Sequence, residues 1–200
     1  NAQLWPIWQT ICYSFYSSNH STMPKAILYT AVTLDGYIAD AQGGIEFLDH
    51  PLFRLPDEDY GYSAFYESID AVIMGHNTFE KIKSFEGSYP YSEKHSVILS
   101  TKQSLADGVS EGIEVSNEPA EVALNELKSK YGTVWIVGGG ATNAKLHRAG
   151  LIDEMILTYI PTTLGAGIPL FRSNESTANW KNISTRTYPN GLVQIHLVKA

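Results

Sequence analysis

The chain has 200 residues, of which 44% are hydrophobic and 18% are charged, and its formal net charge is −7. This composition is typical of one globular domain with a full core, and the negative charge argues against a general nucleic-acid binder. A single cysteine, Cys12, excludes an internal disulfide and a cysteine-based metal site, and the six histidines lack HxxxH or HExxH spacing. No apolar run has the length of a membrane span. We therefore expect a cytoplasmic protein without a metal ion that binds neither nucleic acid nor a membrane.

The first 22 residues differ from the rest because they are rich in aromatics and contain no Lys or Arg. A secretory signal would need a basic start and a continuous apolar centre, and both are missing here. The stretch "MPKAILYTAV" then begins at Met23 like a natural start. We predict that residues 1–22 are an extension and that residues 23–200 form the domain.

Strands and helices are expected to alternate along the chain. Hydrophobic spacing and start signals predict, in order, a strand at 26–32, a helix at 56–69, a strand at 71–74, a helix at 78–83 and strands at 97–100 and 113–115. A helix at 118–131, a strand at 134–137, a helix at 141–149 and a strand at 154–160 follow. Pro189-Asn190-Gly191 then joins strands 182–187 and 192–198 as a hairpin. The pattern predicts a single α/β domain: a mostly parallel twisted sheet with an antiparallel C-terminal hairpin and helices on both faces.

Three predicted strands are followed by residues suited to phosphates and ribose hydroxyls. Ligands of such sheets bind outside the carboxyl ends of the strands. Gly138-Gly139-Gly140 stands at one of these ends and opens a helix, where bare backbone admits a phosphate and helix N–H groups point at an anion. The stretches 75–78 and 100–102 follow two other strands. A tight strand-to-helix turn is an equally good explanation of the glycines, since the GxGxxG dinucleotide fingerprint is absent.

Several longer stretches resemble a known family. "ILYTAVTLDGYIAD", "IDAVIMGHNTFE", "SVILSTK" and "VWIVGGGATNAKLHRAGLIDEMILTYIPTTLGAGIPLF" occur in the order and spacing seen in the dihydrofolate reductase superfamily. "DYGYSAFYESID" is similar to its stand-alone bacterial members, which resemble the reductase domain of the deaminase-reductases of riboflavin biosynthesis. The resemblance covers residues 25–199. It implies a homodimeric NADPH-dependent reductase acting on a C=N-type bond of a pteridine or ribosylaminopyrimidine, most like 5-amino-6-(5-phosphoribosylamino)uracil reductase.

The resemblance also implies a cofactor site. A cis Gly138–Gly139 turn would lie against the pyrophosphate, and the residues from Ser100 to Lys102 would meet the adenosine ribose and its 2′-phosphate. His76 and Ala141 stand where many relatives have arginine. His76 capping its helix and Lys102 as a plain surface lysine are the alternatives. The implied set is Ala31, Ile38, Gly75, His76, Thr78, Ser100, Thr101, Lys102, Val137, Gly138, Gly139, Gly140, Ala141 and Thr142.

Asp59 is the candidate catalytic acid. It precedes Met74 by 15 residues, the spacing at which the resemblance places a substrate carboxylate. In a helix, Asp59 would share one face with Ser63 and Tyr66. Helix capping by Asp59 is the alternative, as core packing is for the aromatics, and the second nearby acid, Asp35, belongs to an Asp-Gly turn. The expected substrate-binding set is Phe47, Leu48, Ser63, Tyr66 and Thr158.

Two other functions stay open on this reading. One is dihydrofolate reductase proper, which the acid at Asp59 favours. The other is a nucleotide- or pterin-binding protein without turnover, which the loss of an arginine at His76 favours.

Overall fold

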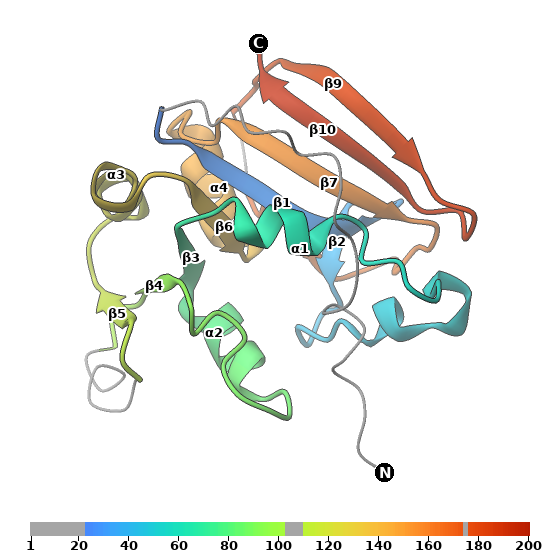
Figure 1. The fold of residues 1–200 in the computed structure, drawn as a ribbon, viewed down its shortest axis with the longest axis horizontal. Helices are drawn as coiled ribbons and strands as arrows, with labels where there is room; N and C mark the ends of the chain where they lie inside the picture. The colour runs from blue at the N-terminus through green and yellow to red at the C-terminus, as the bar shows by residue number, and fades with distance from the viewer. Residues whose placement is uncertain (1–22, 103–109, 174–175) are drawn as a thin grey trace.

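A twisted sheet of eight strands organises the molecule (Figure 1). The computed structural model describes residues 23–102, 110–173 and 176–200, so the predicted extension 1–22 lies outside the described residues. The strands, in spatial order, are β5 (Ile113–Ser116), β4 (His95–Leu99), β3 (Ala71–Gly75), β6 (Val134–Gly138), β1 (Ala26–Thr33), β7 (Glu154–Ile160), β10 (Val193–Lys199) and β9 (Trp180–Thr187). The first six run parallel, and the β9–β10 hairpin adds two antiparallel strands next to β7. The predicted fold class is therefore confirmed.

Helices cover both faces of the sheet because its central strands are apolar on both sides. In β1, Leu28 packs in one buried cluster with Leu124 of α3 (Ala120–Tyr131), next to α4 (Gly140–Arg148). The adjacent Ile27 belongs to a second cluster with Phe65 of α1 (Tyr62–Glu67) and Phe79 of α2 (His76–Lys83). Successive side chains of a strand point to opposite faces, which explains this division. In Figure 1, α1 crosses in front of the sheet and α4 lies behind it.

The predicted helix at 56–69 is much shorter in the structure, where α1 covers only Tyr62–Glu67. The backbone has positive φ angles of 61° at Asp57, 57° at Tyr60 and 81° at Gly61. Left-handed residues interrupt the hydrogen-bonding pattern of a right-handed helix. Asp59 therefore precedes the helix, and the prediction that it shares a helical face with Ser63 and Tyr66 is wrong.

Four short elements between residues 37 and 169 were not predicted from the sequence. The strands β2 (Tyr37–Ala39) and β8 (Ile168–Pro169) form a separate antiparallel pair, and two 3-10 helices, η1 (Glu46–Asp49) and η2 (Pro51–Phe53), lie between β2 and α1. Asp35 joins the two distant segments, because its carboxylate accepts hydrogen bonds from the Thr33 hydroxyl and from the amides of Leu164 and Gly165. These bonds, that of Thr33 first, lower the pKa of Asp35. The structure thus shows Asp35 in a turn, as its Asp-Gly sequence indicated.

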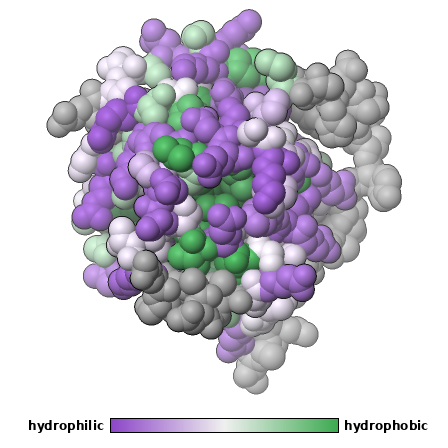
Figure 2. Space-filling view, turned by 90° about the vertical axis from the view of Figure 1, so that its left-hand side faces the viewer, coloured by the Kyte–Doolittle hydropathy of each residue, from purple (hydrophilic) through white to green (hydrophobic). Residues whose placement is uncertain are grey.

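The strand β5 forms one edge of the sheet, and Glu114 is its exposed residue. Figure 2 views this side of the molecule and shows hydrophobic residues in small groups between hydrophilic ones. A charge on an edge strand discourages pairing with another chain. Glu114 of β5 supplies such a charge, and its carboxylate lies 3.3 Å from Nε2 of His95. In the described part of the chain, no helix has the length and apolarity needed to cross a membrane.

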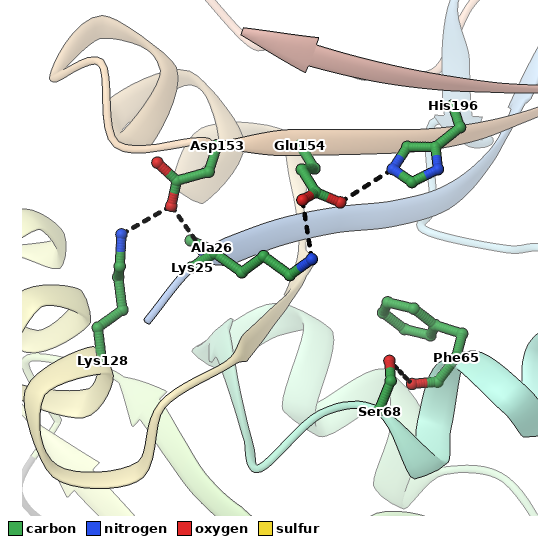
Figure 3. A network of polar contacts seen from close by, with 8 residues as sticks. All are labelled: Lys25, Ala26, Phe65, Ser68, Lys128, Asp153, Glu154 and His196. Atoms are coloured by element: carbon green, nitrogen blue, oxygen red, sulfur yellow. Dashed lines mark hydrogen bonds and ion pairs between the residues drawn. The ribbon is translucent and has the colours of Figure 1, made fainter. Parts of the chain in front are cut away.

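Ion pairs join the amino-terminal ends of β1 and β7 to the carboxyl-terminal half of β10, which runs antiparallel to β7 (Figure 3). The Glu154 carboxylate lies 2.8 Å from Nζ of Lys25 and 2.9 Å from Nε2 of His196. Beside it, Asp153 accepts hydrogen bonds of 2.7 Å from the Lys128 ammonium and from the Ala26 amide. The His196 hydrogen bond, followed by the Lys25 contacts, lowers the pKa of Glu154 to about 2. These bonds fix the register of the three strands at the end of the sheet where β1 and β7 begin and β10 finishes.

Replacing Glu154 with Gln should remove a pH-dependent part of the stability. A carboxylate whose pKa falls from 4.5 to about 2 on folding stabilises the fold above pH 4.5, and this stabilisation is lost as the pH falls toward 2. We expect E154Q to be less stable at pH 7 by about 1–3 kcal/mol and to have a flatter profile between pH 4.5 and 2. Urea unfolding across this range measures both effects.

Glu80 supplies the control, because its carboxylate forms an exposed pair with Lys83 at 3.6 Å. The E80Q variant should follow the wild-type profile, since exposed pairs contribute little. An E154Q profile as steep as that of the wild type would contradict the assignment.

Candidate active site

The carboxyl ends of the parallel strands bring the predicted cofactor residues to one edge of the sheet. Gly75 at the end of β3 pairs with Leu99 at the end of β4, and Met74 pairs with Gly138 at the end of β6. The stretches 75–78, 100–102 and 138–142 follow these ends and are therefore neighbours, although up to 67 residues separate them in the chain. The expected convergence of three strand ends is what the structure shows.

The three-glycine turn is closely packed. The Gly138–Gly139 peptide is cis, as the resemblance implied, and Gly138 has a φ of 108°. Gly139 is the N-cap of α4, and its amide donates a 2.9 Å hydrogen bond to Oγ1 of Thr78 in α2. A Cβ atom at Gly140 would collide with the carbonyl oxygen of Pro169. Packing against the protein itself therefore requires glycine at position 140.

The same close approach occurs at the end of β3. A Cβ atom at Gly75 would lie 2.9 Å from Oγ1 of Thr142, a buried residue of α4. A Cβ at Gly139 would lie 3.1 Å from Oγ1 of Thr78. The two helix N-termini thus meet through backbone and two threonine hydroxyls, so the tight-turn explanation of the glycines holds whether or not a phosphate also binds here.

A cationic group lies beside the start of α2. Nζ of Lys102 is 3.3 Å from Nε2 of His76, and Lys102 is anchored by its amide, which donates 3.0 Å to Oγ of Ser100. Nδ1 of His76 is buried and has no hydrogen-bond partner among the described residues, so His76 does not cap its helix. The Lys102 ammonium can only donate, whereas the role of each imidazole nitrogen depends on the tautomer. A helix N-terminus, an ammonium and an imidazole nitrogen without a partner together fit a phosphate-bearing group.

The other predicted cofactor residues lie at or near the same edge. Ala31 and Val137 are half-buried in β1 and β6, and Ile38 of β2 packs against the α3–α4 side of the core. On α4 and after β4, Ala141 and Thr101 are exposed. Core packing accounts for Ile38 and Val137 without any ligand.

Asp59 is buried, with 8% of its surface exposed. One carboxylate oxygen accepts a 2.8 Å hydrogen bond from the Gly61 amide and the other a 3.0 Å bond from the Ser63 amide. The Asp59 carboxylate therefore holds the turn before α1, as the capping alternative predicted. Each oxygen retains a second acceptor position, so capping leaves the carboxyl group able to contact a ligand.

The predicted substrate residues divide into two groups. Thr158 of β7 is buried and accepts a 3.0 Å hydrogen bond from Gln194 of β10, which also donates to the Tyr60 carbonyl. Tyr66 packs elsewhere: it stacks on Tyr62, and the Lys94 ammonium lies 5.1 Å from its ring centre. Core packing explains Tyr66, and the structure does not bring it beside Thr158.

Aromatic and aliphatic side chains form a third cluster at the carboxyl end of β7. Its buried members are Tyr60, Ile160, Tyr188 and Leu192, and the partly buried residues Ala31, Phe47, Leu48, Phe53 and Leu55 pack against them. Phe47 and Phe53 also border a hollow of about 390 Å³ that reaches Pro161. Ala31, Phe47 and Leu48 were predicted as site residues. Tyr188 and Gln194 were not predicted, because only the hairpin docking on β7 brings them to this edge.

Metal ligands do not gather in the described part of the chain, where no group of three or more His, Cys, Asp or Glu side chains could hold an ion.

Comparison with known proteins identifies relatives over nearly the whole domain. The family described as the RibD C-terminal domain matches residues 24–194. Two uncharacterized proteins of Bacillus subtilis are similar: YwjB, 36% identical over 88% of this chain and 98% of its own, and YyaP, 30% identical over 89% and 96%.

Solved structures agree with this result. A putative riboflavin biosynthesis protein from Shewanella has a TM-score of 0.80 and 31% identity over 88% of this chain and 99% of its own. Dihydrofolate reductase from Enterococcus faecalis, complexed with NADP(H), has a TM-score of 0.60 and 18% identity over 88% and 96%. The second similarity shows a common fold alone.

Replacing Gly140 with Ala tests the packing of the glycine turn. The added methyl group would meet the Pro169 carbonyl and the side chain of Ile168, so we expect a loss of about 1–3 kcal/mol in the free energy of unfolding. Ala141→Ser, one residue further and exposed, should change it by about 0.5 kcal/mol or less. Urea denaturation measures both, and equal stability of G140A and wild type would refute the close contact.

Proposed function

Because the chain belongs to the RibD C-terminal domain family, we propose that it is an NADPH-dependent reductase. The observation that carries the proposal is the meeting of three strand ends beside the His76–Lys102 pair, with an aromatic cluster at the end of the next strands. The first arrangement suits a dinucleotide and the second a flat heterocycle. The homodimer implied by the resemblance belongs to the same proposal.

The proposed cofactor contacts use groups that the protein leaves unsatisfied. Lys102 and His76 would hold the 2′-phosphate, because they supply an ammonium and an imidazole nitrogen without a partner among the described residues. The exposed Thr101 and the first turn of α4 would receive the rest of the nucleotide. NADPH, when bound, supplies a hydride for reduction. The residues fit such a group, although nearby glycines are also required by packing.

The protein's own part in the reaction would be to orient the substrate, exclude water and provide a proton. Phe47 and Leu48 would cover one side of the heterocycle. Ala31 of β1 would flank the nicotinamide. Asp59 would relay the proton to nitrogen, because it is buried near this cluster and its oxygens keep lone pairs that can bind a proton before passing it on. A ribosylaminopyrimidine such as 5-amino-6-(5-phosphoribosylamino)uracil is the proposed substrate, which the likeness to the Shewanella protein supports.

Two alternatives are separated by one assay. Dihydrofolate reductase activity is favoured by the burial of both Asp59 and Thr158. A binding protein without turnover is favoured by the histidine at position 76. The purified protein would be mixed with NADPH and either 5-amino-6-(5-phosphoribosylamino)uracil or dihydrofolate, and the absorbance at 340 nm followed. Turnover with the first compound supports the proposal, turnover with only the second favours the first alternative, and NADPH binding without oxidation favours the last.

The Lys102→Ala variant should distinguish NADPH from NADH. A charge-assisted contact with phosphate contributes roughly 1.5–3 kcal/mol, so we expect the dissociation constant for NADPH to rise about 10- to 100-fold. The constant for NADH, which lacks the 2′-phosphate, should stay within about twofold. Fluorescence titration measures both.

Lys181 of β9 offers a matched control, since it is an exposed lysine remote from the carboxyl edge. K181A should bind both cofactors like the wild type. If K102A weakens NADPH and NADH equally, Lys102 has no role in phosphate recognition.

The Asp59→Asn variant should separate the two roles of this carboxylate. Asparagine also caps, so the free energy of unfolding should change by about 1 kcal/mol or less. Because the amide cannot supply the proton, kcat/KM should fall about 100-fold. Asp57→Asn, at an exposed neighbour, is the control and should keep full activity. Unchanged kcat/KM in D59N across the pH range would leave Asp59 with capping alone.

A further inference from the structure

The hydroxyl group of Tyr188 is buried without a partner. The residue is 5% exposed, and its phenolic oxygen has no hydrogen bond within the described part of the chain. A buried polar group without a partner costs free energy that a phenylalanine of the same shape would not cost. The neighbouring phenol shows the usual situation: the Tyr60 hydroxyl donates 2.7 Å to the Phe53 carbonyl and accepts 2.8 Å from Asn190. Tyr188 is therefore an exception within its own cluster.

Tyr188 lies where a ligand of this fold would bind. It follows β9 in the hairpin turn, where its amide donates 2.9 Å to the Leu192 carbonyl. Val193, which follows Leu192 and begins β10, pairs with Tyr159 near the carboxyl end of β7. The ring of Tyr188 contacts that of Tyr60 edge to face, with 4.9 Å between the centres. The hairpin thus inserts this phenol into the cluster that Ala31, Phe47 and Leu48 border.

Polar groups surround the phenol without satisfying it. Burial raises the pKa of Tyr188, Arg186 opposes this, and the carboxylates of Glu58 and Asp59 raise it further. Tyr188 therefore stays a neutral phenol at physiological pH, able to donate one hydrogen bond and to accept others. The Tyr29 hydroxyl nearby is already engaged, since it donates 3.2 Å to the Tyr60 carbonyl. A donor and acceptor is thus available next to the proposed proton donor.

One wall of the cluster contains no fully buried side chain. The 3-10 helices η1 and η2, which carry Phe47, Leu48 and Phe53, contain no buried residue. Segments with few buried contacts open at low free-energy cost. A flat ring entering from the adjacent hollow would move this wall and reach the phenol.

We propose that Tyr188 is a substrate-binding residue, whose hydroxyl forms a hydrogen bond with a carbonyl or amino group on the heterocyclic ring of the substrate. This assignment rests on the proposed reductase function and extends it, since it places the ring between the β9–β10 hairpin and η1. Uracil and pterin rings both present such groups, so the hydroxyl would orient the ring whichever of the two is reduced.

The Tyr188→Phe variant tests the assignment through two readouts. The variant without ligand should unfold at the same urea concentration as the wild type or a higher one, because no hydrogen bond is lost. With 5-amino-6-(5-phosphoribosylamino)uracil or dihydrofolate, whichever the wild type reduces, KM should rise about tenfold or more while kcat changes less. The dissociation constant for NADPH should stay within twofold.

Tyr89→Phe is the matched control, because the Tyr89 hydroxyl donates 3.0 Å to Oγ of Ser96 in the core. It should show the opposite pattern: a lower unfolding midpoint and unchanged KM. If Y188F has the wild-type KM, or if it unfolds as readily as Y89F, the assignment is overturned. If the wild type oxidises NADPH with neither compound, the proposed function fails and this assignment fails with it.

Discussion

The close approach of two helix N-termini at the carboxyl edge of the sheet is the constraint on which the candidate site depends. The helices α2 and α4 begin directly after the neighbouring strands β3 and β6, so their first turns must pass each other with little space. Glycine at positions 75 and 139 removes the Cβ atoms that would crowd the threonine hydroxyls of the facing helix, and the Gly139–Thr78 hydrogen bond joins the two turns. Gly140 removes a Cβ atom that would collide with the Pro169 carbonyl of β8. The same geometry points backbone N–H groups of both helices toward one edge, where anions are favoured. Packing and ligand binding thus use the same residues.

The two edges of the sheet carry opposite kinds of polar chemistry. At the amino ends, carboxylates and cations are paired with each other, as Glu154 is with Lys25 and His196. At the carboxyl ends, Lys102 has only Nε2 of His76 within reach, and the Tyr188 hydroxyl has no partner, among the described contacts. Satisfied groups stabilise a fold, whereas unsatisfied buried groups cost free energy and are retained where a ligand can use them. This difference locates the candidate site without reference to any relative.

Asp59 combines a structural role with a position in the candidate site. Left-handed backbone at Asp57, Tyr60 and Gly61 ends the extended chain and turns it into α1, and the Asp59 carboxylate holds that turn through two amide bonds. A cap of this kind immobilises the carboxyl group beside the aromatic cluster. A group that is rigid before the ligand arrives loses little entropy on binding.

The amino-acid sequence alone determined the alternation of elements and the parallel sheet, because β1, β3, β4, β6 and β7 are apolar runs bounded by clear turn residues. It also determined that Gly75, Ser100 and Gly138 would meet, since parallel neighbours share one carboxyl edge. The tertiary structure alone decided the rest. Left-handed residues before α1 override helical spacing and remove Asp59 from the helix, and β2 and β8 are too short for any periodicity to show. Tyr188 and Gln194 reach the site only because the hairpin pairs with β7, a contact between distant segments that no local pattern encodes.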